Sequence, residues 1–288
     1  MAVIDSQVHA YEADTPARPW IDRITGPAQA TGHDQIAAMD AAGVDGAIIV
    51  STYTTYRYDS SYAQQVHAQF PDRFALVKPV DATDPAVAED IAQWSSQPGA
   101  VGVRVMLTMA ENKDPLDPGL NLALAEGGRR GQVVNLFAWD ALDEAHALAA
   151  RHPNTSVVID HVGLRQPRRP EPQDTVGPDR WADLPKVLAL AELDHVRIKL
   201  SGAATMSRQA FPYDDIWDPL LRIIDAFGVE RCMWGTDWTR AVKMLSYDQA
   251  VEAFRQTTRL SDSDRAMLMG GATEATYGWA PKVLSKAL

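Results

Sequence analysis

The sequence predicts an α/β protein: one (β/α)8 barrel that occupies residues 1–288. Eight short apolar runs alternate with about eight segments of helical pattern, and this alternation indicates parallel strands joined by crossover helices. No change in composition marks a domain boundary, and barrels of this length are common as single domains. A doubly wound sheet is the main alternative. An Arg- and Pro-rich loop at about 163–178 is the one segment that resembles an insertion.

The elements follow one another with short connections. Strands are expected within 3–12, 46–52, 74–80, 101–107, 132–139, 156–161, 196–201 and 232–238. Helices are expected at 33–42, 60–70, 85–97, 120–130, 141–151, 181–193, 216–227 and 246–277. Gly43 and Gly228 follow two of these helices, as is typical of helix C-termini. Pro71 and Pro153 end two others, because proline cannot continue a helix.

Charge and cysteine content exclude some functions and locations. The net charge of −11 argues against nucleic acid or an anionic membrane as the main partner. The single cysteine, Cys232, cannot form an internal disulfide, which favours a reducing compartment. The N-terminus has no signal-peptide pattern, and no apolar run approaches the length of a membrane span. We therefore expect a cytoplasmic protein.

Polar side chains interrupt the apolar strands, mostly near their C-terminal ends. They are Gln7, His9, Arg104, Asn135, His161, Lys199, Ser201 and Asp237. In a barrel, these strand ends carry the active site. The combination of His9, His161 and Asp237 is harder to explain by packing than any single member. These residue types suit either a divalent metal or an acid–base site that activates water, and the pattern alone leaves both open.

Several short motifs, in order along almost the whole chain, resemble one family. They are IDSQVHAYE at 4–12, YRYDSSY at 56–62, VGVRV at 101–105, VVIDHVGL at 157–164, RIKLSG at 197–202, WGTDW at 234–238 and GGATEATYGW at 270–279. The chain thus resembles the amidohydrolase superfamily of TIM-barrel hydrolases. Within it, the similarity is to the branch that includes 2-pyrone-4,6-dicarboxylate lactonase and sugar-acid lactonases.

The resemblance implies roles for particular residues. Asp237 would be the base that activates water, and His9 and His161, with Gln7, would polarise the lactone carbonyl. Substrate contacts would come from Arg104, Arg165, Arg168, Tyr56, Tyr58, Asp59 and Trp238. Arginine suits a carboxylated substrate, because its planar fork meets a carboxylate with two hydrogen bonds.

The sequence departs from the family pattern on the first strand. The family usually has His-x-His there, whereas this chain has Gln7 before His9. A glutamine carbonyl is a poor zinc donor compared with imidazole. Arg104 and Asn135 stand where a two-metal site would need Lys and His. We therefore expect no required cofactor; the alternative is one divalent cation, Zn or Mn, held by His9, His161 and Asp237.

The resulting hypothesis is a hydrolase that opens a small carboxylated lactone, with water activated by Asp237. Three alternatives remain at this point: a mononuclear metal hydrolase, a decarboxylase of the same superfamily, and a barrel that binds a ligand without catalysis. Intact His161 and Asp237 argue against the last. Both a monomer and a homo-oligomer are consistent with the sequence.

Overall fold

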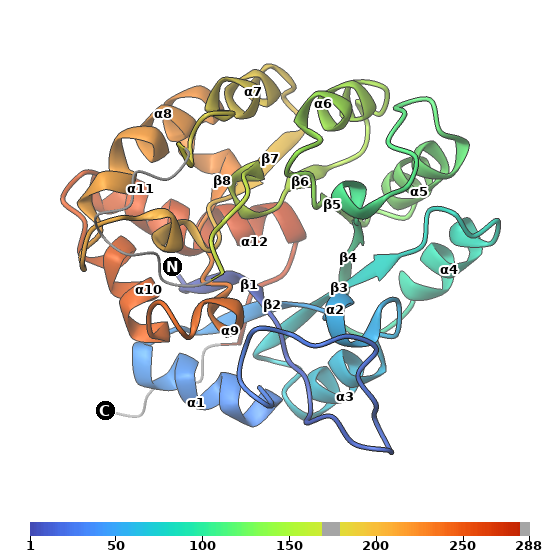
Figure 1. Ribbon diagram of the computed structural model, residues 1–288, viewed down its shortest axis with the longest axis horizontal. Coiled ribbons are helices and arrows are strands. Elements are labelled where there is room, and N and C mark those ends of the chain that lie inside the picture. Colours follow the sequence, from blue (N-terminus) through green and yellow to red (C-terminus); the bar gives the residue numbers. More distant parts are fainter. Residues whose placement is uncertain (169–178, 283–288) are drawn as a thin grey trace.

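The computed structural model describes residues 1–168 and 179–282. Eight parallel strands follow one another around a barrel in sequence order (Figure 1). They are β1 Ile4–Val8, β2 Gly46–Val50, β3 Phe74–Val80, β4 Ala100–Val105, β5 Val133–Leu136, β6 Val157–Ile159, β7 Val196–Lys199 and β8 Cys232–Met233. A doubly wound sheet would reverse its strand order partway, so the (β/α)8 prediction is confirmed.

The barrel closes at the seam between β1 and the segment that follows β8. Ser6 N donates a hydrogen bond to Trp234 O at 3.1 Å, and Asp237 N donates to Gln7 O at 3.0 Å. The buried carboxylate of Asp5 reinforces the seam by accepting hydrogen bonds from the amide and the hydroxyl of Thr236. The seam therefore brings the first strand beside the loop that carries Asp237.

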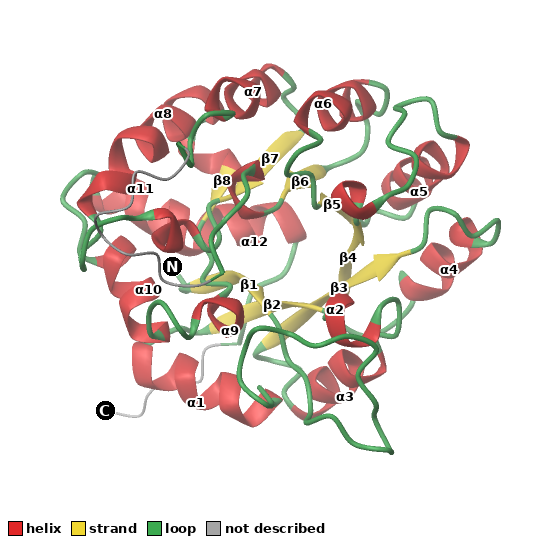
Figure 2. Ribbon diagram, in the orientation of Figure 1, coloured by secondary structure: helices red, strands yellow, loops and turns green. Residues whose placement is uncertain are grey.

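Helices surround the strands (Figure 2). They are α1 Gly32–Ala42, α2 Tyr53–Tyr56, α3 Ser61–Gln69, α4 Val87–Trp94, α5 Pro118–Arg129, α6 Leu142–Ala150, α7 Leu184–Ala189, α8 Trp217–Phe227, α9 Trp238–Ala241, α10 Tyr247–Arg255, α11 Asp262–Ala266 and α12 Ala272–Tyr277. Thr31 caps α1 and Gly43 ends it in the left-handed conformation. None of the helices in the described ranges is long and apolar enough to cross a membrane.

Side chains fill the barrel interior, so it is a core and not a pore. One cluster of buried residues comprises Ile48, Val50, Ala75, Val77, Val133, Val158 and Met233 of the strands, with Ala272 and Tyr277 of α12. Tyr277 reaches into the barrel and donates a hydrogen bond to Asn135 Oδ1 at 2.6 Å. Helix α12 thus covers one end of this core, while the polar strand ends lie at the other.

Several predicted boundaries were wrong, mainly where strands end. The eighth strand was expected to reach residue 238, but β8 ends at Met233. Beyond β8, Asp237 has φ of 48°, a left-handed conformation; His161 has the same conformation beyond β6, with φ of 55°. The predicted helix at 246–277 is divided into α10, α11 and α12. Residues 169–178 of the expected insertion lie outside the described residues.

The Asp5 carboxylate at the seam makes the stability of the protein depend on pH in a testable way. Burial raises the pKa of Asp5 to about 6, despite the hydrogen bonds from Thr236. A raised folded-state pKa means that the folded protein holds this proton more tightly than the unfolded chain does. This group's contribution to stability is therefore lost as pH rises from about 4 through 6, by on the order of 2–3 kcal/mol.

Asp5→Asn tests this expectation, because asparagine can still accept from Thr236 N but carries no charge. Urea unfolding between pH 4.5 and 7.5 should show the variant gaining stability relative to wild type as pH rises. A difference in unfolding free energy that does not change with pH would contradict it.

Candidate active site

A cavity of about 130 Å³ opens where the C-terminal strand ends meet. Five residues predicted for the site line it: His9, Arg104, His161, Arg168 and Asp237. The other lining residues are Arg23, Ile24, Thr25, Thr52, Tyr53, Thr54, Met106, Met109, Phe137, Trp139 and Arg240. The wall is thus partly apolar and otherwise strongly basic.

Asp237 presents its two carboxylate oxygens to different neighbours. Arg240, three residues further along in α9, donates from Nε to Oδ2 at 2.5 Å. The same guanidinium donates to Gln166 Oε1 at 2.5 Å and to Pro167 O at 2.9 Å, which fixes its position. The other oxygen, Oδ1, accepts no well-aligned hydrogen bond from the described residues, and His9 Nε2 lies 3.3 Å from it. Oδ1 is therefore the carboxylate oxygen that lacks a hydrogen-bond donor among the described residues.

Asp237 is ionised although it is almost completely buried. Burial opposes the charge, but Arg240 outweighs it and holds the pKa of this carboxyl well below its ordinary value. Its left-handed backbone is a conformation that residues other than glycine rarely adopt. Such outliers cluster at functional sites, where the surrounding structure holds them in place.

His9 has a defined tautomer. Its Nδ1 lies 2.7 Å from Val50 O, and a carbonyl oxygen can only accept, so Nδ1 carries the proton. When the ring is neutral, Nε2 therefore holds a lone pair. This lone pair lies beside Asp237 Oδ1 and 3.4 Å from the side-chain nitrogen of Gln7.

His161 is held from both sides of its ring. Arg104 donates from Nη2 to Nε2 at 3.0 Å, so the proton of the neutral ring is on Nδ1, which lies 3.1 Å from Ser201 Oγ and 3.6 Å from Asp237 Oδ2. Burial lowers the pKa of His161 to about 3, although the nearby carboxylates of Asp237 and Asp160 favour protonation. The imidazole is therefore neutral at physiological pH.

Beneath the two histidines, the buried carboxylate of Asp160 pairs with two cationic side chains. Asp160 Oδ2 accepts from Arg104 Nε at 2.7 Å, and Oδ1 lies 3.1 Å from Lys199 Nζ. Lys199, which is fully buried, also donates to Gln7 Oε1 at 2.9 Å. Burial opposes ionisation of Asp160, but Lys199 and Arg104 together lower its pKa to about 2.

Four residues expected to touch the substrate have their polar groups engaged elsewhere, and they do not line the cavity. Tyr56 accepts from Glu12 N at 3.0 Å, and Asp59 accepts from Ser61 N at 2.8 Å at the start of α3. Trp238 donates to Gln35 Oε1 at 2.9 Å. Tyr58 packs edge-on against Tyr53, and Tyr53 is the tyrosine at the cavity wall.

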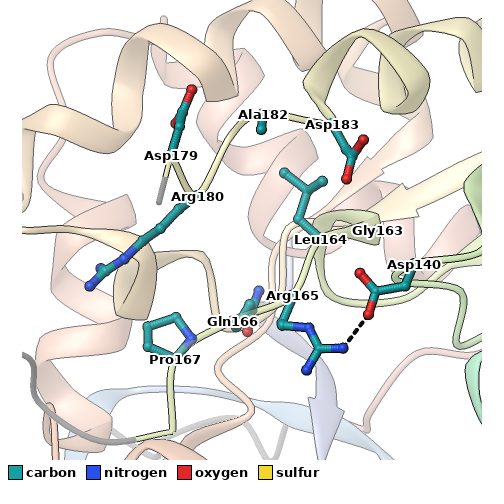
Figure 3. A pocket seen from close by; sticks show the side chains of 10 residues that line it. All are labelled: Asp140, Gly163, Leu164, Arg165, Gln166, Pro167, Asp179, Arg180, Ala182 and Asp183. Carbon is teal, nitrogen blue, oxygen red and sulfur yellow. Dashed lines mark hydrogen bonds and ion pairs between the residues drawn. The ribbon is translucent and has the colours of Figure 1, made fainter. Parts of the chain in front are cut away.

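Arg165 and Gln7 also lie outside the cavity wall. Arg165 pairs with Asp140 beside a separate pocket near α7 (Figure 3). Arg168, in the same loop, does line the cavity, with its guanidinium 5.9 Å from the centroid of the Trp139 ring. Gln7 is fully buried below His9, so it contacts the histidine and not the cavity.

Sequence reasoning missed Arg240 and Gln166. The spacing of Arg240, three residues after Asp237, was a usable signal, since residues one helical turn apart share a face. Gln166 lies in an irregular loop, and its pattern gave no indication that it would hold Arg240.

The residues proposed as metal ligands do not form a metal site in this arrangement. In the ranges that the structure describes, no three His, Cys, Asp or Glu side chains converge to hold an ion. Arg104 donates to Nε2 of His161, and Arg240 donates to Oδ2 of Asp237. Three cations, Lys199, Arg104 and Arg240, already face two carboxylates, so a divalent cation would meet a net positive charge.

Comparison with known proteins places these features in a family. The profile of the amidohydrolase family matches residues 4–279. The chain is 27% identical to L-fucono-1,5-lactonase of Burkholderia multivorans over 95% of both chains. It is 28% identical to 4-sulfomuconolactone hydrolase of Hydrogenophaga intermedia, over 81% of this chain and 73% of that protein.

A solved structure shares the whole fold. An amidohydrolase from Burkholderia multivorans, crystallised with bound zinc, aligns with a TM-score of 0.77 and 25% identity over 96% of this chain and 99% of that one. The profile match and these similarities extend over nearly all of the chain. The protein is therefore a hydrolytic enzyme that belongs to the amidohydrolase family.

Proposed function

We propose that this enzyme opens the ring of a small lactone that carries a negative charge, by adding water to the lactone carbonyl. The observation that carries the proposal is the pairing of Asp237 Oδ1 with the His9 Nε2 lone pair, two acceptors 3.3 Å apart at a basic cavity. The named activities of two relatives, a fuconolactonase and a sulfomuconolactone hydrolase, support the same reaction class.

The two acceptors suit one water molecule. The water would donate one hydrogen bond to Asp237 Oδ1 and the other to His9 Nε2, leaving an oxygen lone pair directed at the carbonyl carbon. Asp237 takes a proton as the carbon–oxygen bond forms. When the tetrahedral intermediate collapses, the ring acyl–oxygen bond breaks and the proton passes to the departing oxygen. The product is a hydroxy acid whose new carboxylate contains one oxygen from water.

The developing oxyanion requires donors, and the geometry favours Arg104 over the histidines that the sequence suggested. His9 offers an acceptor at Nε2, and both ring nitrogens of His161 are engaged. The Arg104 guanidinium is a permanent donor, held in place by Asp160. Arg168 and Arg23 line the same cavity and suit an anionic substituent of the substrate.

The donor set supports chemistry without a resident metal. The atoms that a metal would need are held by Arg240 and Arg104, and the Arg104 guanidinium supplies positive charge to the oxyanion. The test is hydrolysis of a panel of carboxylated and neutral lactones, followed by pH indicator and product mass. The expected product is the hydroxy acid, formed by addition of water and without release of carbon dioxide. Carbon dioxide release would favour the decarboxylase alternative.

Asp237→Asn should lower kcat by at least about 10³-fold, because an amide cannot accept the proton from water. The variant should still fold, since the side chain keeps its shape, but with a lower melting temperature because Arg240 loses its charged partner. Asp140→Asn is the matched control: Asp140 also has a left-handed backbone, but it pairs with Arg165 outside the cavity. That control should retain full activity. Full activity of Asp237→Asn would contradict the assignment of Asp237 as the general base.

Three arginine variants separate the proposed roles. Arg104→Met should lower kcat by about 10²-fold or more, as expected for loss of an oxyanion donor. Arg168→Met should mainly raise KM for a carboxylated lactone and leave a neutral one unaffected. Arg165→Met should change neither constant. Steady-state kinetics on matched lactones with and without a carboxylate measures this, and a large effect of Arg165→Met alone would contradict the proposal.

Gln7→His tests the metal proposal. A histidine at this position would face Lys199 and His9, so we expect no tight zinc binding and no gain in activity. Metal content after equilibrium dialysis against zinc, measured by mass spectrometry, gives the stoichiometry for wild type and variant. Treatment of wild type with a chelator should leave turnover unchanged. One tightly held zinc ion per Gln7→His chain would show that the site is a metal centre lacking one ligand.

A further inference from the structure

Lys199 and Gln7 have no role in the reaction as described above, yet they are fully buried beneath it. Lys199 Nζ joins Asp160 Oδ1 at 3.1 Å to Gln7 Oε1 at 2.9 Å. Gln7 Nε2 in turn lies 3.4 Å from Nε2 of His9. These contacts form a continuous chain from a buried carboxylate to the imidazole beside Asp237. A buried ammonium is costly unless it is paired, so the arrangement calls for a reason.

The direction of this chain is fixed by chemistry. An ammonium group has three donors and no acceptor, so the atom of Gln7 that faces Lys199 must be the carbonyl oxygen. The amide nitrogen therefore faces His9 and can only donate to it. Without Lys199, the two orientations of the amide would differ far less in energy, and Gln7 could turn its oxygen toward His9.

Both nitrogens of His9 are then determined. Val50 O accepts the proton of Nδ1, and the Gln7 amide faces Nε2 as a donor. A proton on Nε2 would meet the N–H group of Gln7, so this arrangement favours the lone pair there. The same lone pair lies 3.3 Å from Asp237 Oδ1.

We propose that Asp160, Lys199 and Gln7 are positioning residues that hold His9 in the Nδ1–H tautomer, so that its Nε2 lone pair orients the attacking water beside Asp237. The tautomer is a property of the folded protein alone, whereas its catalytic consequence rests on the proposed lactone hydrolysis. Glutamine at position 7 is then a required donor in the hydrogen-bond chain. It stands in place of a histidine, whose imidazole would itself compete for a metal or for the water.

The tautomer can be measured directly, without any substrate. Two-bond ¹H–¹⁵N correlation spectra of protein labelled at histidine distinguish the two neutral tautomers, and a His9→Asn variant assigns the His9 signals. Wild type should show His9 protonated at Nδ1. Gln7→Leu and Lys199→Met should each shift the Nε2 resonance of His9. Protonation of His9 at Nε2 in wild type would overturn the inference, whatever the substrate.

Kinetics on a lactone that the enzyme opens tests the catalytic consequence. Gln7→Leu and Lys199→Met should each lower kcat by about 10- to 100-fold with KM within about twofold, since the substrate contacts are unchanged. Because both act through the same hydrogen-bond chain, the double variant should be no slower than the worse single variant. Losses that multiply, or an unchanged kcat in either single variant, would contradict the proposal.

Gln7→Glu covers the case in which Lys199→Met does not fold. A glutamate keeps the partner of Lys199 but has no N–H group for His9, so kcat should fall as far as in Gln7→Leu while the melting temperature is retained. Tyr277→Phe is the control, because it removes a buried hydroxyl near Lys199 that is outside the chain, and it should retain wild-type kcat. A fully active Gln7→Glu enzyme would overturn the inference. If wild type opened no lactone, only the kinetic arm and the proposed function would fail, and the tautomer would still be tested.

Discussion

The ion pairs of Asp160 are the interaction on which the candidate site depends. This buried carboxylate binds Arg104 with one oxygen and pairs with Lys199 through the other. One arm continues through Arg104 to His161, and the second continues through Lys199 and Gln7 to His9. Both arms end beside Asp237. Removing either cation leaves a buried charge with less compensation, which typically costs about 3–5 kcal/mol when a buried pair is broken.

The same charges restrict the chemistry that Asp237 can perform. Arg240 keeps the pKa of Asp237 low although burial opposes this, so the carboxylate is ionised at physiological pH but is a weak base. A weak general base is effective when the electrophile is already reactive and the oxyanion is well stabilised. Lactones with a good leaving oxygen are therefore favoured as substrates, and the Arg104 guanidinium at the cavity supplies the stabilising charge.

Much of the fold could be predicted from alternating patterns, because apolar runs and helix-terminating residues are local signals. Of the polar residues near the strand ends, His9, Arg104, His161 and Asp237 line the cavity. The left-handed turns at His161 and Asp237 could not be predicted, because tertiary hydrogen bonds impose them on residues that do not favour them. For the same reason, local sequence did not reveal that Gln166 would hold Arg240.

The central claim is that Asp237 activates water and does not itself attack the lactone. A single turnover with excess enzyme in H₂¹⁸O tests it most directly. The peptide of residues 232–240, bounded by Arg231 and Arg240, allows the label on Asp237 to be read by mass spectrometry after trypsin digestion. The account predicts one ¹⁸O atom in the product carboxylate and none in the peptide. An unlabelled product with ¹⁸O in the peptide would show a covalent acyl-enzyme on Asp237 and would contradict the account.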